Sequence, residues 1–267
     1  MNKRLMFSAA LVMALLSANA QKRAFTIEDL YRVKGVSSVS LSPDGKTVCY
    51  TASSSDLKNQ KSGSDIYIMN ADGSHAKALT EDGKSSSAVW SKDGKSIFFT
   101  NYEKGTAQIF RMDLTTCETE QVTDYELGIG SPVISPDERY IAFTAEVYPD
   151  LGADAKANKA RMEKKEQGPV QAHIADKLLY RHWTSYNDGR CNHLILFDTQ
   201  TKTYKDLTPG NYSLIFVVGG GITYQFSPDS KEICFVSNHD EHQEASTNAD
   251  LWTVSVNGGE PVCITKE

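Results

Sequence analysis

The run His239-Asp240-Glu241-His242, with Glu244 two residues later, is the densest group of candidate metal ligands in the chain. Imidazole and carboxylate groups bind a metal when rigid elements hold them and neighbouring groups orient them. Asn, Ser and Thr surround this run, a composition typical of a loop. We therefore expect a solvated loop between two strands, with no metal site, and we expect the protein to need no cofactor.

A second candidate is the run Gly219-Gly220-Gly221, whose backbone could approach a phosphate group closely. A phosphate-binding loop also needs a Lys-Ser or Lys-Thr pair and the start of a helix. No such pair follows the three glycines, and no helix is expected there. The run therefore indicates a flexible connection before the strand at Ile222-Thr223-Tyr224.

Arg181, His182 and Trp183 are the residues best suited to contact a ligand or a partner. Arg and Trp are frequent anchors of protein interfaces. The three residues lie in a segment from about Glu146 to Asn192 that interrupts an otherwise regular sequence pattern. Two interpretations stay open: the residues contact a ligand or partner, or they pin the segment onto its own repeat.

The regular pattern is a unit that contains Ser-Pro-Asp-Gly-Lys or a close variant. Pro presets φ for a turn, Asp bonds the backbone two residues on, and an apolar run then enters a strand. The aspartates are therefore turn residues and not catalytic acids. The four copies of the unit are Leu41–Thr51, Trp90–Thr100, Ile134–Thr144 and Phe226–Val236, and their aspartates are Asp44, Asp93, Asp137 and Asp229.

A second unit alternates with the first, as an apolar strand followed by a closing threonine. Its copies begin at Asp65, Gln108, His193 and Asp250, and they close at Thr80, Thr123, Thr208 and Thr265. One repeat is about 43 residues with some four short strands, the size of a propeller blade. The sequence predicts an all-β protein, a β-propeller with about four blades. A β-sandwich with coincidental turns is the structural alternative.

The interrupting segment, 146–192, is expected to be partly helical. Residues 154–166 have a helix-forming composition with mixed charge and no apolar stripe, which predicts a solvated helix. The later part is richer in apolar and aromatic groups, and Leu178 and Leu179 are expected to pack in a core. Cys49 and Cys234 lie in strand-like runs and are expected to be small buried hydrophobes.

Composition limits the location and the partners of the protein. Lys3 and Arg4, an apolar stretch and a small-residue cleavage site predict a signal peptide over 1–20, which leaves the propeller over 21–267. We expect an exported protein, periplasmic or secreted. No apolar run is long enough for a membrane span, and the net charge of −6 argues against nucleic-acid binding.

Propellers usually close four to eight blades into a ring, because closure protects the edge strands. About four blades are present here, and the chain ends two residues after the last closing threonine, Thr265. We therefore expect a partial ring and a chain that is part of a longer protein.

The sequence resembles the prolyl-oligopeptidase family of serine peptidases, in its dipeptidyl-peptidase and acylaminoacyl-peptidase branch. The repeats alone are shared with TolB-like propellers. More specific are the opening and parts of the interrupting segment. The similar stretches are Phe25–Leu30, Leu178–Trp183, Asp188–Arg190, Leu207–Gly210 and Ala245–Leu251.

The resemblance implies a propeller that gates peptide access to an α/β-hydrolase domain with a Ser–Asp–His triad. The nucleophile of such a domain sits in a G-x-S-x-G elbow, and none occurs here; Gly128–Pro132 has its serine out of register. We therefore expect a non-catalytic propeller portion of an exported exopeptidase, with peptides or a hydrolase domain as partners. The alternative is a free-standing TolB-like propeller that binds proteins of the cell envelope.

Overall fold

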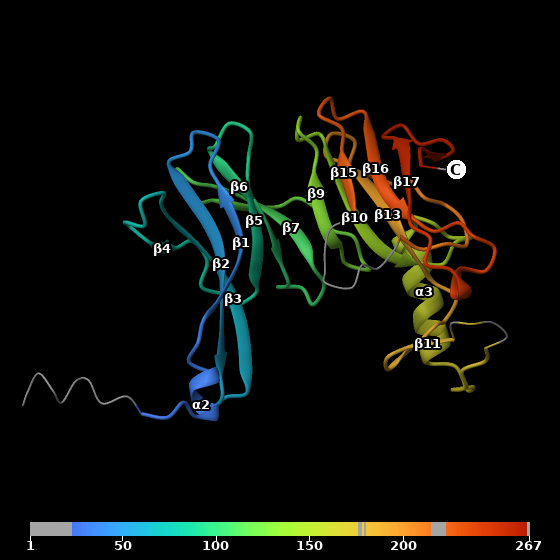
Figure 1. Cartoon of the computed structure of the whole chain (residues 1–267), viewed down its shortest axis with the longest axis horizontal. Coiled ribbons are helices and arrows are strands. Elements are labelled where there is room, and N and C mark those ends of the chain that lie inside the picture. Colours follow the sequence, from blue (N-terminus) through green and yellow to red (C-terminus); the bar gives the residue numbers. More distant parts are fainter. Residues whose placement is uncertain (1–22, 176–177, 179, 215–222, 266–267) are drawn as a thin grey trace, which may run out of the picture.

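The computed structural model describes residues 23–175, 178, 180–214 and 223–265 (Figure 1). The predicted signal peptide, Leu179 and the Gly219–Gly221 run lie outside these residues. The described part contains four separate four-stranded antiparallel sheets, each with its strands in chain order, and one two-stranded hairpin. This arrangement confirms the prediction of an all-β propeller with four blades.

The first two blades follow one another directly along the chain. Blade 1 consists of β1 (Gly35–Leu41), β2 (Thr47–Asp56), β3 (Lys61–Asn70) and β4 (Lys77–Ala78). Blade 2 consists of β5 (Ser85–Trp90), β6 (Ser96–Asn101), β7 (Gln108–Asp113) and β8 (Thr119–Gln121). A single-turn helix, α2 (Ile27–Leu30), precedes blade 1.

The last two blades include a long insertion. Blade 3 consists of β9 (Gly130–Ile134), β10 (Tyr140–Val147), β13 (Cys191–Asp198) and β14 (Thr203–Asp206). Helix α3 (Ala155–Glu166) and the hairpin β11 (Arg181–His182) and β12 (Ser185–Tyr186) lie between β10 and β13. Blade 4 consists of β15 (Tyr224–Phe226), β16 (Glu232–Ser237), the 3-10 turn η1 (Gln243–Ala245), β17 (Asp250–Ser255) and β18 (Val262–Cys263).

The first repeated unit forms the turn between the first and second strands of each blade. In every copy the serine hydroxyl donates to the aspartate two residues on, at 2.6–2.7 Å. The same aspartate accepts the backbone N–H two residues further along, at 3.0–3.2 Å. These bonds confirm that Asp44, Asp93, Asp137 and Asp229 hold turns.

The second repeated unit fastens the third strand of each blade. The closing threonine accepts the N–H of the second residue of the unit at 2.9 Å in all four blades. The threonine thereby extends the ladder beyond the short fourth strand. Each blade is therefore closed by a polar contact at the same position.

Apolar clusters fill the spaces between neighbouring blades. One cluster joins blades 1 and 2, the next joins blades 2 and 3, and the third joins blades 3 and 4.

Cys49 is fully buried in the cluster between blades 1 and 2, as expected. The expectation for Cys234 was wrong, because it lies on the outer side of blade 4 and is half-buried. None of the five cysteines of the chain, all of them described, is in a disulfide.

The outer side of blade 1 is apolar and has no neighbouring blade in the described part of the chain. Cross-strand partners point to the same side of a sheet, so Val36, Leu41, Val48, Tyr50, Tyr67 and Met69 share this side, opposite to the buried Thr51 and Ile66. Val36 is 63% exposed, and the Tyr50 and Tyr67 rings stack with centroids 5.6 Å apart. We call these six residues the open face of blade 1.

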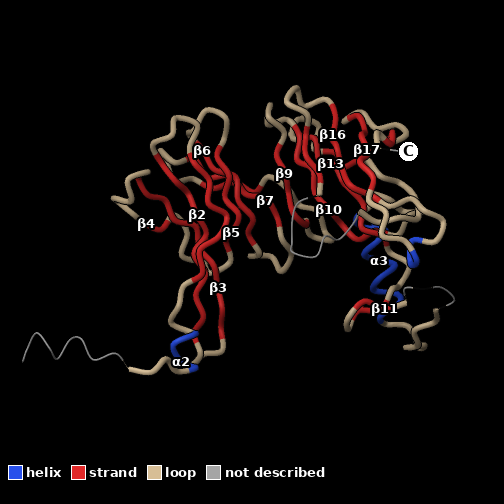
Figure 2. The backbone as a smooth tube through the Cα atoms, viewed as in Figure 1, coloured by secondary structure: helices blue, strands red, loops and turns tan. Residues whose placement is uncertain are grey.

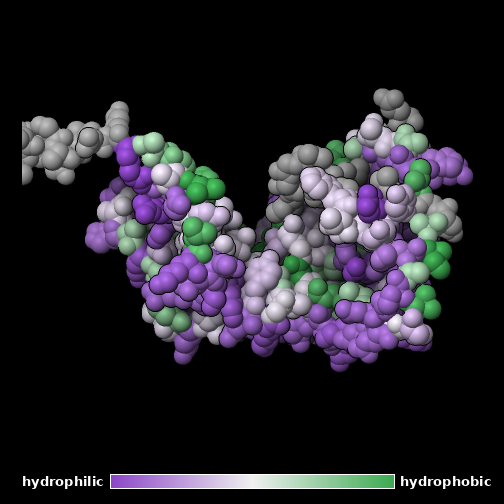
Figure 3. Space-filling model, turned by 90° about the horizontal axis from the view of Figure 1, so that it is seen from below, coloured by the Kyte–Doolittle hydropathy of each residue, from purple (hydrophilic) through white to green (hydrophobic). Residues whose placement is uncertain are grey.

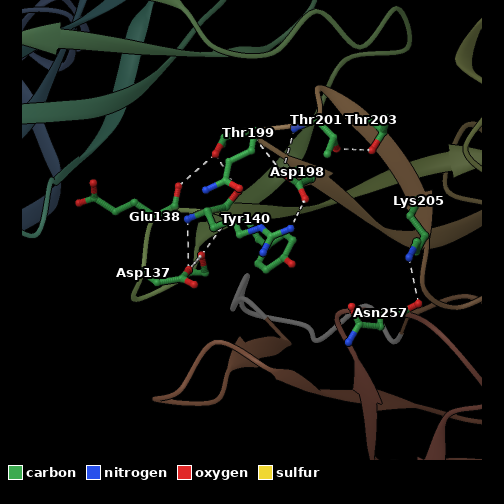
Figure 4. Close-up of polar contacts among 12 residues, drawn as sticks. Asp137, Glu138, Tyr140, Asp198, Thr199, Thr201, Thr203, Lys205 and Asn257 are labelled. Atoms are coloured by element: carbon green, nitrogen blue, oxygen red, sulfur yellow. Dashed lines mark hydrogen bonds and ion pairs between the residues drawn. The ribbon is translucent and has the colours of Figure 1, made fainter.

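The two ends of the propeller blades differ in character. The turn-bearing end is polar around blade 3: Arg139 pairs with Asp198 at 3.0 Å, and Lys205 Nζ donates to the Asn257 carbonyl of blade 4 at 2.9 Å (Figure 4). The opposite end carries α2, the tip of the β2–β3 hairpin and the blade 3 insertion, which project from the blades in the same direction (Figure 2). Seen from that end, the surface is hollowed between the two halves of the molecule (Figure 3).

Candidate interaction site at the blade 3 insertion

The base of the insertion is fixed by one buried amide side chain. Asn158 has no exposed surface. Its Oδ1 accepts the N–H of Tyr148 at 2.7 Å, and its Nδ2 donates to the carbonyls of Gly152 and Asp154 at 3.0 and 2.8 Å. These bonds satisfy the polar groups of Asn158 and hold the turn after β10 against α3. The insertion therefore starts from a rigid support.

Helix α3 confirms the helix predicted over residues 154–166. Asp154 is the N-cap and accepts the N–H of Ala157 at 2.9 Å. Asn158 is the only buried residue of the helix, so the helix is solvated as expected. Lys159 pairs with Glu126 at 3.4 Å, and Arg161 pairs with Asp150 at 2.7 Å. These exposed pairs orient the helix more than they stabilise it.

The predicted contact residues lie on the β11–β12 hairpin. Arg181 is opposite Tyr186 and His182 is opposite Ser185 in the ladder. Trp183 occupies the turn with φ 52°, and 84% of its surface is exposed. Arg181 is also exposed, and the His182 side chain lies outside the described part.

The expectation that Leu178 packs in a core was wrong. Leu178 is 65% exposed, because this part of the insertion stands away from the three apolar clusters. Large apolar side chains are instead displayed along the insertion: Val170, Ile174, Leu178, Tyr180, Trp183 and Tyr186. Exposed groups of this kind are typical of surfaces that contact another molecule.

The hairpin combines a cation with aromatic surfaces. The Tyr186 ring stacks on His173, with centroids 3.9 Å apart and an interplanar angle of 6°. Arg190 closes the hairpin base, since it pairs with Asp188 at 3.0 Å and with Glu146 of β10 at 3.1 Å. The exposed Arg181 guanidinium can bind a carboxylate of a peptide or protein, and the exposed rings can bind an apolar side chain.

The couple between the buried His193 and Asp206 was not predicted from the sequence. His193 Nδ1 lies 2.7 Å from Asp206 Oδ2, directly beneath the insertion base. One signal was present in the sequence: His193 opens the second repeated unit, where the other copies have Asp or Gln. The acidic partner could not be inferred, because it comes from a different strand.

The metal-ligand candidates around His239 are separated in the structure. His242 and Glu244 form an exposed pair at 3.1 Å, as expected for a solvated loop. The expectation was wrong for His239, whose ring lies between Tyr212 at 3.6 Å and Trp252 at 3.9 Å. Burial lowers the pKa of His239. Among the described residues, no three His, Cys, Asp or Glu side chains are arranged to hold a metal.

Ser131 has no features of a nucleophile. It lies in β9, the first strand of blade 3, with φ 46°. A nucleophile elbow requires a sharp turn between a strand and a helix.

A search of the described residues for a helix that could span a membrane, by length and hydropathy, finds none.

Family comparisons agree with this geometry. A family model described as the TolB beta propeller domain matches residues 19–167, more than half of the chain. A second model, the dipeptidyl peptidase IV N-terminal region, matches residues 153–267 and so includes the insertion hairpin.

Curated relatives include peptidases. Dipeptidyl-peptidase 5 of Porphyromonas gingivalis is 29% identical over 231 residues, which cover 84% of this chain and 33% of the relative. The uncharacterized peptidase YuxL of Bacillus subtilis is 25% identical over 234 residues, which cover 86% of this chain and 34% of that protein. The chain thus spans about a third of the length of these relatives.

Solved structures support the fold. An acylaminoacyl peptidase from Pyrococcus horikoshii superposes with a TM-score of 0.62 at 18% identity, over 89% of this chain and 33% of that one. The propeller of the trilobed protease from Pyrococcus furiosus gives a TM-score of 0.51 at 16% identity, over 89% of this chain and 58% of that one. The chain belongs to the TolB β-propeller domain family, in the form found as the N-terminal propeller of prolyl-oligopeptidase-family peptidases.

Proposed function

We propose that this chain is the non-catalytic propeller portion of an exported serine exopeptidase of the dipeptidyl- or acylaminoacyl-peptidase kind. In this role it gates the access of peptides to an α/β-hydrolase domain. The observation that carries the proposal is the match of residues 153–267, with their insertion, to the N-terminal region of dipeptidyl peptidase IV.

The open face of blade 1 supports the proposal. A sheet side that displays Val36, Leu41 and a stacked pair of tyrosines resembles the sides that pack between blades elsewhere in the molecule. Exposed apolar surface of this extent is unfavourable in water and marks an interface. Further blades of a longer protein would cover it.

The insertion hairpin is the proposed contact with the peptide or with the hydrolase domain. Arg181 and His182 form its strand β11 and Trp183 lies in its turn, on the insertion that projects from the blades in the same direction as α2 (Figure 2). The Arg181 guanidinium on this short hairpin can orient a peptide carboxylate, while Trp183 supplies apolar contact area.

The experiment compares this chain with the product of the whole gene, including any reading frame that continues beyond Glu267. The substrates are dipeptidyl and acetyl-aminoacyl 4-nitroanilides. We expect hydrolysis only by the longer product, and loss of that activity when the serine of its G-x-S-x-G elbow is replaced by Ala. Hydrolysis by the 267-residue chain alone would overturn the proposal. Export is tested separately, by N-terminal sequencing for cleavage after Ala20.

The match to the TolB propeller over more than half of the chain favours a second candidate, a free-standing propeller that binds envelope proteins. This candidate requires a compact monomer and a stop codon after Glu267, followed by unrelated sequence. Crosslinking in intact cells would then capture one specific envelope partner.

A further inference from the structure

The surroundings of His193 require both of its ring nitrogens to carry hydrogen. The side chain has no exposed surface. Nδ1 lies 2.7 Å from Asp206 Oδ2, and Nε2 lies 3.0 Å from the carbonyl oxygen of Gly210. A carbonyl oxygen only accepts hydrogen bonds, and so does an ionised carboxylate. A neutral imidazole has one N–H and would leave one buried contact unmade, so the geometry selects the imidazolium.

This charged couple occurs in blade 3 and in no other described blade. The position of His193 is taken by Asp65, Gln108 and Asp250 in the other blades, and each of these accepts the hydroxyl of its closing threonine, at 2.8–3.1 Å. The position of Asp206, two residues before the closing threonine, is taken by Ala78, Gln121 and Cys263. The pairing of a histidine with a carboxylate at these two positions therefore occurs in blade 3, which carries the insertion.

One side of the couple supports the base of the insertion. Gly152 packs so closely on Asp206 that a Cβ at this position would lie 3.2 Å from Asp206 Oδ2. The hydroxyl of Tyr125 donates to the carbonyl of Ala153 at 3.2 Å and extends the same contact. The turn that leads into α3 therefore rests on the Asp206 carboxylate.

The other side of the couple holds residues 210–212, at the start of the connection to blade 4. The Gly210 carbonyl that accepts from His193 belongs to a residue with φ 144°, and a Cβ there would lie 2.6 Å from the Tyr212 ring. The Tyr212 ring packs on His239, which in turn packs on Trp252 of β17, with the rings of both pairs tilted by 31°. A continuous set of contacts thus runs from His193 to the core of blade 4.

We propose that His193 is kept as an imidazolium and acts as a positioning residue, which holds the insertion base and the Gly210–Tyr212 segment that packs on blade 4 in place together. Removal of its proton breaks one of two buried hydrogen bonds and leaves the Asp206 carboxylate without its counter-charge. Both regions then loosen in one step. This inference does not depend on a peptidase activity.

The groups around His193 determine the pH at which it loses its proton. Burial alone lowers the pKa of His193, but its contacts with Asp206, Cys191 and the Gly210 carbonyl raise it to about 9. An unfolded histidine titrates near 6.5. The folded state therefore binds the proton more tightly: the stabilisation is fully present below about pH 6.5 and is lost as the pH rises through about 9. Tyr125 and Tyr212 also face Asp206, and burial raises the pKa of each above its ordinary range.

The test uses the three tryptophans of the chain, which report on three places: Trp90 in blade 2, Trp183 on the insertion hairpin and Trp252 in the stack of blade 4. The whole chain is labelled with 5-fluorotryptophan and followed by 19F NMR from pH 6 to 10. We expect the Trp183 and Trp252 resonances to move together with a midpoint near 9, while that of Trp90 stays fixed. Long-range 1H–15N spectra at pH 7.5 should show both ring nitrogens of His193 protonated.

Three variants serve as controls. His193→Gln copies Gln108 of blade 2 and should abolish the step near pH 9. Asp206→Asn should move the midpoint down toward 6.5. Cys191→Ser should keep the step, which excludes titration of the neighbouring thiol as its cause. Separate midpoints for Trp183 and Trp252, a step that persists in His193→Gln, or a neutral His193 ring at pH 7.5 would each overturn the inference.

Discussion

The hydroxyl of Ser91 is buried beneath the turn of blade 2, where it donates to Asp93 at 2.7 Å and accepts the N–H of Ser96 at 2.9 Å. Its counterpart Ser227 makes the same contacts in blade 4 at a more exposed turn. Removal of a buried partner costs more than removal of one that water replaces. The same serine hydroxyl therefore contributes different amounts to the free energy of unfolding in different copies of the motif.

We expect Ser91→Ala to lower the free energy of unfolding by about 1–2 kcal/mol, because the N–H of Ser96 is left unpaired in the interior. Ser227→Ala is the matched variant and should cost less than about 0.5 kcal/mol. Urea denaturation followed by circular dichroism measures both. Equal losses for the two serines would show that burial does not determine the effect.

The reactivity of single cysteine thiols gives a second test of how burial affects individual residues. Burial raises the pKa of the Cys49 thiol to about 11, so it stays protonated at pH 8 and should not react with Ellman's reagent. Cys117 is exposed in the turn between β7 and β8 and should react rapidly. Cys117→Ser is expected to remove the fast phase, and Cys49→Ser to leave it unchanged. A fast phase that depends on Cys49 would contradict the burial of its thiol.

Among the elements, the insertion has a fully buried amide side chain, Asn158, at its base. We expect Asn158→Ala to cost about 2 kcal/mol, because it leaves the buried N–H of Tyr148 without its partner and removes the side-chain bonds to the Gly152 and Asp154 carbonyls. Hydrogen exchange should increase over residues 148–166 and stay unchanged in blades 1 and 2. The exposed Lys156→Ala is the control. Unchanged exchange in Asn158→Ala would mean that the insertion is held by other contacts.

The elements that follow from local sequence were predictable, and those that depend on distant partners were not. The turn at Ser42–Asp44 and the helix over 154–166 rest on neighbours within a few residues, so their patterns appear in the sequence. His239 lies between a ring from the loop after β14 and a ring from β17, and no local pattern encodes that pair. Leu178 could not be predicted either. It lies in an apolar run that suggests burial, but it stays exposed because no blade lies beside it.

For the whole molecule, the open face of blade 1 should control association. We expect the isolated chain to self-associate through this face, and the double substitution Val36→Glu, Leu41→Glu to reduce the association because it places charge on the apolar surface. Sedimentation velocity at several concentrations measures the effect. Gln200→Glu, an exposed change on blade 3, is the control for added charge. Equal association of the double variant and the unaltered chain would rule out this face as the contact.

The three apolar clusters each lie between two successive blades, so the described row of four blades shares three interfaces. A row always has one interface fewer than it has blades, whereas a closed ring has as many interfaces as blades. Each blade added to a row therefore gains one interface, but the blade that completes a ring gains two. Ring closure is consequently the most cooperative step in the assembly of such a protein, and the stability of every blade depends on whether that last contact has formed.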